Sequence, residues 1–228
     1  IIIVDDASNE NNKINDVYDV FQNLNIKIIE IQKEDKKWVN PCIPFNIGFN
    51  YASGDVILIQ NPECLHLFDI IKYVKENICK NKYIVFGCYA IGKSKTNEIL
   101  KLFFDSSYLN SIKNIIGKIN NVRYSKDFSV SNRKERCGWY QHTKYRPDNL
   151  HFCSAILKDD LDDLGGFDER FYNGVGKDDR EFLLRIKRKN MEIHSIDDYY
   201  VIHQFHPFAS YGNHLNKDIF KKVRKEKT

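Results

Sequence analysis

The fold of this chain is decided by one stretch of sequence, GGFDERF at residues 165–171 followed by GVGKDDREF at residues 174–182. The glycines indicate a turn, and the apolar residues after it recur at helical spacing, which predicts an amphipathic helix over residues 178–189. Asp178 and Asp179 therefore lie in the first turn of this helix, at the edge of a core. The helix dipole favours acidic residues there, but a positioned carboxylate can also act as a general base. Both roles are open at this point.

Strands and helices alternate in the first half of the chain, and further strands are predicted on either side of this stretch. Apolar and β-branched runs predict strands at residues 1–4, 26–31, 56–59, 83–88, 151–157 and 200–203. Apolar stripes at helical spacing predict helices at residues 14–24, 45–52, 67–74 and 97–116. This alternation favours a three-layer α/β/α, Rossmann-like fold around a mixed, mainly parallel sheet. Residues 120–150 are polar and aromatic without a clear period, which predicts a long functional loop.

The composition narrows the class of protein. The 228 residues suit a single domain over 1–228, and the net charge of +4 is nearly balanced. The only basic run, residues 217–227, is interpreted as the solvated face of a terminal helix, so no nucleic-acid partner is expected. The six cysteines form no CxxC pair, which favours reduced thiols and a cytoplasmic location. No apolar run approaches about 18 residues, so no membrane span is expected.

Polar residues follow several of the predicted strands. Asp5 and Asp6 end the first strand, QNPE at residues 60–63 ends the third, and His203 ends the last. Ligands of open α/β sheets bind at the carboxyl ends of the strands, so we expect these residues to converge on one crevice. His203 and His206 would point to opposite faces of a strand. They share a site only if the chain turns between them, which Pro207 favours.

The acidic pair has other interpretations. Asp5 and Asp6 can form a turn that caps a helix, or they can open a response-regulator receiver domain. A receiver needs an aspartate where this chain has Gln60. It also needs a lysine at the end of a further strand, and residues 83–89 contain none.

GGFDERF at residues 165–171, together with the later pair Asp178 and Asp179, resembles a signature of inverting glycosyltransferases of the GT-A fold. DDAS at residues 5–8, and the pattern of Asn46, Gly48 and residues 52–55, are similar to segments of glycosyltransferase family 2. The C-terminal segment resembles galactosyltransferases. The resemblance implies that Asp179, with Asp178 beside it, is the catalytic base. It also implies that Asp6, with Asp5 secondary, holds the nucleotide.

The same resemblance implies further binding residues. Residues 1–90 become the nucleotide-sugar half and residues 91–228 the acceptor half, and a further strand is expected before Ile1. The donor-binding residues would include Asn46, Gln60 and Asn61, and the acceptor-binding residues Trp139, His142, Asp168 and Glu169. For Trp139, stacking on a sugar and packing in a core are both open.

The Asp-x-Asp metal motif of this family is altered in the chain. Gln60 stands in place of the first aspartate, Pro62 in place of the second, and Glu63 follows. Without the resemblance these residues indicate only a strand-to-helix turn. With it, Glu63 and the histidines His203 and His206 become candidate ligands for Mn²⁺ or Mg²⁺.

The implied reaction transfers a sugar from a nucleotide diphosphate, interpreted as UDP-linked, to a hydroxyl group with inversion. The acceptor would be a glycan, a protein or a lipid-linked molecule, and the enzyme a hexosyltransferase. Two alternatives remain open. A sugar nucleotidyltransferase would need a glycine- and basic-rich phosphate loop after its first strand. A non-catalytic protein that binds glycans or nucleotide sugars would fit the loss of Asp-x-Asp.

Overall fold

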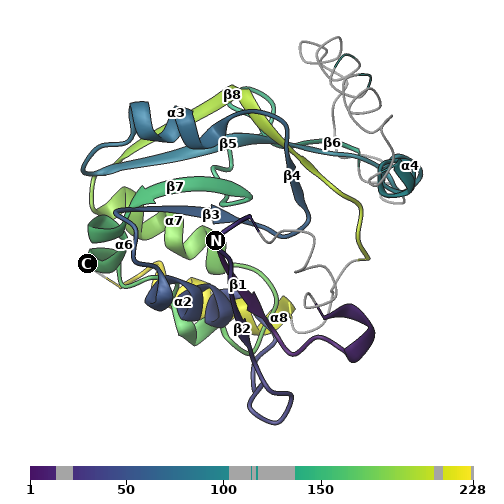
Figure 1. Ribbon diagram of the computed structural model, residues 1–228. Helices are drawn as coiled ribbons and strands as arrows, with labels where there is room; N and C mark the ends of the chain where they lie inside the picture. The colour runs from purple at the N-terminus through teal and green to yellow at the C-terminus, as the bar shows by residue number, and fades with distance from the viewer. Residues whose placement is uncertain (14–22, 103–113, 115–116, 118–136, 208–212, 227–228) are drawn as a thin grey trace. The chain divides into compact units, whose positions relative to one another are not determined.

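The computed structural model describes residues 1–13, 23–102, 114, 117, 137–207 and 213–226 (Figure 1). The chain divides into two compact units. Unit 1 comprises Ile1–Ile57, Ile156–Met191 and Ala209–Thr228, and unit 2 comprises Leu58–Ala155 and Glu192–Phe208. The helix predicted at residues 14–24 falls almost wholly outside the described residues, as does the later part of the helix predicted at residues 97–116.

Unit 1 begins with two parallel strands, β1 (Ile2–Asp5) and β2 (Lys27–Glu30), and the short 3-10 helix η1 (Glu10–Asn12) follows β1. The helix α2 (Cys42–Tyr51) packs on β1, and Gly48 faces Val4 there. These elements confirm the local predictions. Among the described strands, β1 and β2 pair with each other in a two-stranded sheet. The exposed charges of Lys27 and Glu30 suit β2 to an edge rather than to a sheet interior.

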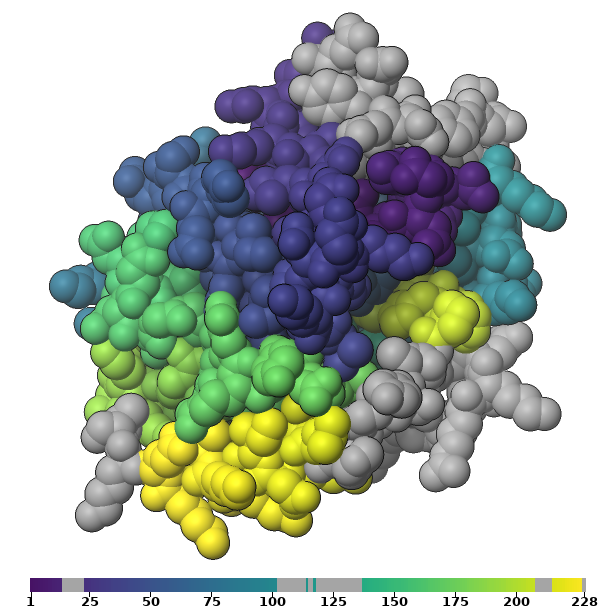
Figure 2. Space-filling model, turned by 90° about the horizontal axis from the view of Figure 1, so that it is seen from below, coloured from purple at the N-terminus to yellow at the C-terminus, as the bar shows by residue number. Residues whose placement is uncertain are grey.

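The described part of unit 1 also contains the helical segments α6 (Lys158–Leu164), η3 (Glu169–Phe171), α7 (Asp178–Arg188) and α8 (Asn213–Val223). The predicted helix over residues 178–189 is confirmed as α7, whose buried stripe is Phe182, Leu183 and Ile186. The helix α8 exposes Lys221 and Lys222, as the basic run predicts. It contacts α7 and η3, and Figure 2 shows its yellow atoms against the green atoms of the segment that contains η3.

Unit 2 is built on a mixed sheet with the strand order β3-β7-β5-β8-β4, and β6 pairs with β5. In chain order the strands are β3 (Val56–Gln60), β4 (Cys64–His66), β5 (Lys82–Ala90), β6 (Gly138–Gln141), β7 (Cys153–Leu157) and β8 (Glu192–His203). The first residues of β3 and the last of β7 belong to unit 1. β5 runs parallel to β8, whereas β4 is antiparallel to β8 and β6 to β5. The described helices of unit 2 include α3 (Ile70–Asn77) and α4 (Lys93–Leu102).

Two predictions about unit 2 are corrected. The loop predicted at residues 120–150 contains β6, which was hidden by its mixed residues but buries Trp139 and Gln141. The strand predicted at residues 200–203 is longer and begins at Glu192, because its polar first half pairs with β5 up to a bulge between Phe86 and Gly87. None of the described helices is long and apolar enough to cross a membrane.

Candidate active site

The segment that we call the acidic loop, residues 165–179, begins at two glycines that follow α6. Gly165 has φ 77° and Gly166 has φ 68°, left-handed values that residues with a Cβ rarely adopt. A Cβ at Gly166 would also lie 2.5 Å from Oδ1 of Asn46, which is closer than a Cβ approaches a non-bonded atom. The glycines therefore allow the chain to turn tightly against α2.

Asn46 holds the start of the acidic loop with both ends of its side-chain amide. Its Oδ1 accepts a hydrogen bond from the N–H of Phe167 (2.8 Å). Its Nδ2 donates to the carbonyl of Phe167 (2.9 Å) and to Oε1 of Glu169 (2.9 Å). The buried ring of Phe167 packs against the rings of Phe45, Phe49 and Phe182. Donor binding by Asn46 stays a prediction, because its amide serves the loop in this structure.

Asp168 and Arg170 form an ion pair within this loop, and Arg170 also pairs with Glu226. The Asp168 carboxylate accepts hydrogen bonds from the backbone N–H of Arg170 (2.9 Å) and from its guanidinium (2.6 Å). The same guanidinium donates to Oε1 of Glu226 (2.8 Å). Burial alone would raise the pKa of Asp168, but the hydrogen bonds and charge of Arg170 lower it below its usual value. Acceptor binding by Asp168 and by the exposed Glu169 stays a prediction.

Asp168→Asn is expected to lower the free energy of unfolding in a pH-dependent way. The folded pKa of Asp168 lies below the unfolded value of about 3.9, so its ionised form stabilises the fold above that pH. This contribution is lost as the pH falls through the folded pKa. Urea unfolding of both proteins should therefore show a difference at about pH 7 that shrinks towards about pH 3.

The control for this prediction is Asp162→Asn, which removes an exposed carboxylate that pairs with Lys158 on α6. An exposed pair of this kind contributes about 0–1 kcal/mol. A difference between the wild type and Asp168→Asn that is equally large at both pH values would contradict the prediction.

Asn40 fixes the far end of the acidic loop. Its side chain is fully buried, and its Nδ2 donates to the carbonyl of Gly174 (2.9 Å) and to Oδ1 of Asp178 (3.0 Å). Its Oδ1 accepts from the N–H of Cys42 (2.9 Å). Burial, and then the negative charge of Asp178, raise the pKa of Cys42 to about 12. The sequence prediction missed Asn40, and its only local signal is the Asn-Pro pair that it forms with Pro41.

The two adjacent aspartates of α7 have different surroundings. Asp178 is 3% exposed and accepts a hydrogen bond from Asn40, so its carboxylate is committed to the protein interior. Asp179 is partly exposed at the first turn of α7, and its Oδ1 accepts from the N–H of Arg180 (2.6 Å). Lys177, with φ 76°, reverses the backbone directly before them. Of the two predicted catalytic residues, Asp179 is therefore the one that a substrate can reach.

The predicted nucleotide-binding pair lies at the end of β1, also in unit 1. The carboxylate of Asp5 is buried and accepts from the N–H of Ser8 (2.8 Å), which closes a turn. Asp6 accepts from Nζ of Lys36 (2.6 Å) and from Nε1 of Trp38 (2.8 Å), two residues that the sequence prediction missed. The Asp6 side chain is 32% exposed. A carboxylate has about four acceptor positions, so Asp6 retains capacity for a further donor group.

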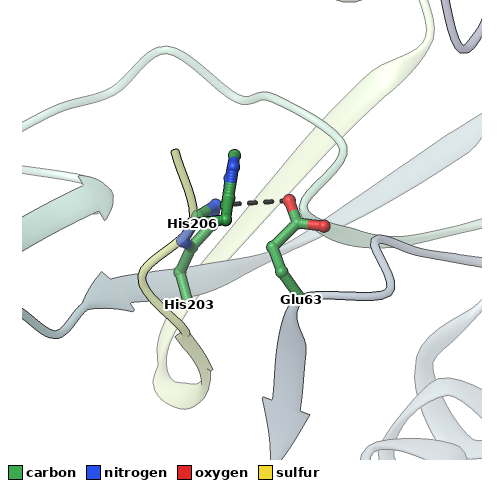
Figure 3. Close-up of side chains that lie close together, drawn as sticks. All are labelled: Glu63, His203 and His206. Atoms are coloured by element: carbon green, nitrogen blue, oxygen red, sulfur yellow. Dashed lines mark ion pairs between the residues drawn. The ribbon is translucent and has the colours of Figure 1, made fainter. Parts of the chain in front are cut away.

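A cluster of one carboxylate and two imidazoles lies in unit 2. Glu63 directly precedes β4, and the antiparallel pairing of β4 with β8 places Cys64 opposite His203. The chain leaves the strand after His203, and this turn returns His206 to the same side. One ligand atom from each of Glu63, His203 and His206 lies within 4.8 Å of the others, and Figure 3 shows the carboxylate facing the two rings. The structure thus brings together all three residues predicted to ligate a metal.

The electrostatics of this cluster suit a divalent cation. Burial alone would raise the pKa of Glu63, but hydrogen bonds from His203 and Asn61 lower it to about 2. The Oε1 of Glu63 lies 3.2 Å from Nε2 of His203 and accepts from Nδ2 of Asn61 (2.9 Å). An ionised carboxylate oxygen together with imidazole nitrogens is a donor set that fits Mn²⁺.

Gln60 and Asn61, predicted to bind the donor, shape the turn that carries Glu63. The Nε2 of Gln60 donates to the carbonyl of Cys64 (2.6 Å), and its Oε1 lies 2.6 Å from Nε2 of His66. The backbone N–H of Asn61 donates to the carbonyl of Phe152 (3.1 Å). Binding of a nucleotide-sugar donor by Gln60 and Asn61 stays a prediction. Their observed hydrogen bonds hold the end of β3 in place.

The predicted acceptor role of Trp139 is wrong in this structure. Its ring is 1% exposed and packs edge-on against Tyr89 and Tyr200, so neither face is open to a sugar. His142 is 6% exposed and packs against Trp139, and its Nδ1 accepts from the N–H of Lys144 (3.0 Å). Because β6 pairs with β5, these side chains are drawn into the core instead of remaining on a loop.

Known structures resemble the chain over nearly its whole length. The crystal structure of GalNAc-T7 with UDP, GalNAc and Mn²⁺ has a TM-score of 0.56 at 12% identity. The match covers 98% of this chain but only 41% of GalNAc-T7. The catalytic domain of Drosophila beta1,4galactosyltransferase 7 with xylobiose has a TM-score of 0.54 at 13% identity, covering 99% of this chain and 80% of that one. At these identities the likeness establishes the fold, which is GT-A.

Sequence comparison assigns the family. No curated protein matches the chain. The profile of glycosyl transferase family 2 matches residues 1–158, which is well over half of the chain. This range includes the DDAS segment, the Asn46 pattern and the altered metal motif through which the sequence resembles the family. The chain therefore belongs to glycosyl transferase family 2 and has the GT-A fold.

Proposed function

We propose that the chain transfers a sugar from a UDP-linked donor to a hydroxyl group, with inversion at the anomeric carbon. The observation that carries the proposal is the cluster of Glu63, His203 and His206, because it supplies metal-ligand chemistry that the altered Asp-x-Asp motif has lost. GalNAc-T7 was crystallised with UDP, GalNAc and Mn²⁺, and the Drosophila enzyme with xylobiose. These complexes support a nucleotide-sugar donor and a glycan acceptor for this chain.

Two carboxylates have separate roles in the proposed reaction. A sugar hydroxyl is a weak nucleophile, and Asp179 takes its proton as it attacks. The exposure of Asp179 supports this role, and the burial of Asp178 argues against it for the neighbour. Asp6, partly exposed beside Lys36 and Trp38, is positioned to accept a hydrogen bond from the nucleotide base.

The residues of the cluster would hold a divalent cation as one carboxylate and two imidazole ligands. When bound, the ion would neutralise negative charge on the departing diphosphate. Glu63 is ionised throughout the neutral range because its pKa is about 2. Imidazole suits Mn²⁺ better than Mg²⁺, so Mn²⁺ is the expected preference. With three protein ligands, the site should be completed by donor phosphates.

The proposed function is tested by a thermal-shift screen of nucleotide sugars with and without Mn²⁺, followed by transfer and hydrolysis assays of each donor that binds. A Mn²⁺-dependent shift with a UDP-sugar, together with turnover, is the expected result. Binding without hydrolysis or transfer would instead identify a non-catalytic binding protein. Formation of a sugar nucleotide from a sugar phosphate would identify a nucleotidyltransferase.

Glu63→Ala and His203→Ala are each expected to weaken binding of Mn²⁺ in the presence of UDP by about 10–100-fold, since even outer partners of metal ligands contribute this much. Calorimetry with and without UDP measures the effect. The control is His194→Ala, which removes a β8 histidine that contacts Tyr73 instead of the cluster. UDP affinity that is the same with EDTA, and the same in both cluster variants, would show that donor binding needs no metal.

A further inference from the structure

Asn216 of α8 makes hydrogen bonds to the acidic loop that could not be predicted from the sequence. Its side chain is fully buried. Its Nδ2 donates to the carbonyl of Phe171 (3.0 Å) and to the carbonyl of Gly176 (2.8 Å). Both carbonyls belong to the loop that leads to Asp179. A residue of the last described helix therefore ties two points of this loop together.

The orientation of the Asn216 amide indicates what the residue contributes. Both N–H groups of Nδ2 point at loop carbonyls, and Oδ1 is buried with no hydrogen-bond partner among the described residues. A buried acceptor without a partner is destabilising, but an apolar side chain at this position would remove the donor that both loop carbonyls now have. The contribution of Asn216 is therefore the fixing of two backbone carbonyls by one amide.

Asn40 holds the same loop at an intervening point, through the carbonyl of Gly174 and the carboxylate of Asp178. The carbonyls of Phe171, Gly174 and Gly176 are thus each bound by an asparagine side chain. The backbone between them continues into Lys177, whose left-handed conformation starts α7. A shift of these carbonyls would be passed directly to Asp179.

We propose that Asn216 is a positioning residue for the base of the transfer reaction, acting through the backbone of the acidic loop on Asp179. This inference rests on the proposed function, in which Asp179 takes the acceptor proton. Reacting groups must be held within a few tenths of an ångström, and a misplacement of about 1 Å costs about 100-fold in rate. Removing the Asn216 contacts should therefore reduce turnover more than it reduces binding.

The test compares Asn216→Ala with Val223→Ala, which truncates another buried side chain of α8 without touching the loop carbonyls. Asn216→Ala is expected to lower kcat by about 10–100-fold, with the KM for donor and the affinity for UDP within a few fold. Val223→Ala should lose comparable stability in urea yet keep its kcat. Equal kcat values in the two variants would overturn the proposal.

A double-mutant cycle with Asp179→Asn separates positioning from general loosening. If Asn216 acts through Asp179, Asn216→Ala should cause little further loss of the residual rate of Asp179→Asn. A full additional loss would show that Asn216 acts on something else, and would overturn the proposal.

Hydrogen exchange supplies a readout that does not depend on activity. The amides of residues 172–179 should exchange faster in Asn216→Ala than in Val223→Ala. Unchanged exchange in this segment would show that the hydrogen bonds of Asn216 do not hold the acidic loop, and would overturn the proposal. If the loop amides exchanged more slowly in the wild type than in Asn216→Ala, but the wild type transferred no sugar from any nucleotide donor, the proposed function would be refuted instead. The two failures are therefore distinguishable.

Discussion

Asp179→Asn is expected to lower kcat by about 10²–10⁴-fold while donor affinity stays within a few fold. Asparagine keeps the shape of the side chain and can still accept the hydrogen bond from the N–H of Arg180, but it cannot take a proton. The proposed nucleotide contact is made by Asp6 and does not involve this side chain. Initial rates with a UDP-sugar and calorimetry with UDP measure the two quantities separately.

Two further variants control this experiment. Asp162→Asn removes an exposed carboxylate from α6 and should leave kcat unchanged. Asp178→Asn should act mainly on stability, because the buried carboxylate of Asp178 accepts a hydrogen bond from Asn40. Near-normal turnover by Asp179→Asn, with a collapse in Asp178→Asn at equal stability, would move the base to Asp178.

Gly166→Ala is expected to lower the free energy of unfolding by about 2–5 kcal/mol. A left-handed residue with a Cβ costs about 1–2 kcal/mol. The new methyl group would also meet Oδ1 of Asn46 at 2.5 Å, which displaces an amide that makes three hydrogen bonds to the loop. The loss of these hydrogen bonds, two of them partly buried, adds about 1–3 kcal/mol. Urea unfolding monitored by circular dichroism measures the change.

The adjacent glycine provides a matched control. Gly165 has a similar φ, but a Cβ there would meet no described atom within 4 Å. Gly165→Ala should therefore cost only the backbone strain of about 1–2 kcal/mol. If the two variants lost equal stability, the contact between Gly166 and Asn46 would have no energetic importance.

The elements that could be predicted are those with a strong local pattern. The run YIVFGC of β5 is buried throughout, and the stripe of α7 repeats at helical spacing, so both are visible in short windows of sequence. β6 could not be predicted, because its polar Gln141 is accommodated in the core by hydrogen bonds with Asn149, a contact that exists only after folding. The separation of β1 and β2 from the larger sheet likewise depends on pairing and not on local propensity.

The same distinction applies to the site. Glu63 and His203 could be predicted as candidate ligands only through the resemblance to glycosyltransferase family 2, which makes residues 60–63 the counterpart of a metal motif. Their meeting depends on β4, a strand of three residues with no periodic signal of its own. Asn40 and Asn216 could not be predicted, because an asparagine in an ordinary turn or helix looks the same in sequence. Trp139 misled the prediction because an aromatic residue suits both a core and a sugar.

The hydrogen bonds that Asn40 and Asn216 make to the acidic loop have a consequence for biosynthesis. Asn40 lies 134 residues before its partner Gly174, and Asn216 lies 40 residues after its partner Gly176. A ribosome adds about 5–20 residues per second, so the nascent chain carries Asp179 for several seconds before Asn216 is made. During this interval the loop lacks the hydrogen bonds from Asn216. We therefore expect the proposed transfer activity to appear only when translation has passed α8, and a chain truncated before that helix to be less stable and poorly active, because it lacks the buried Asn216 and Val223.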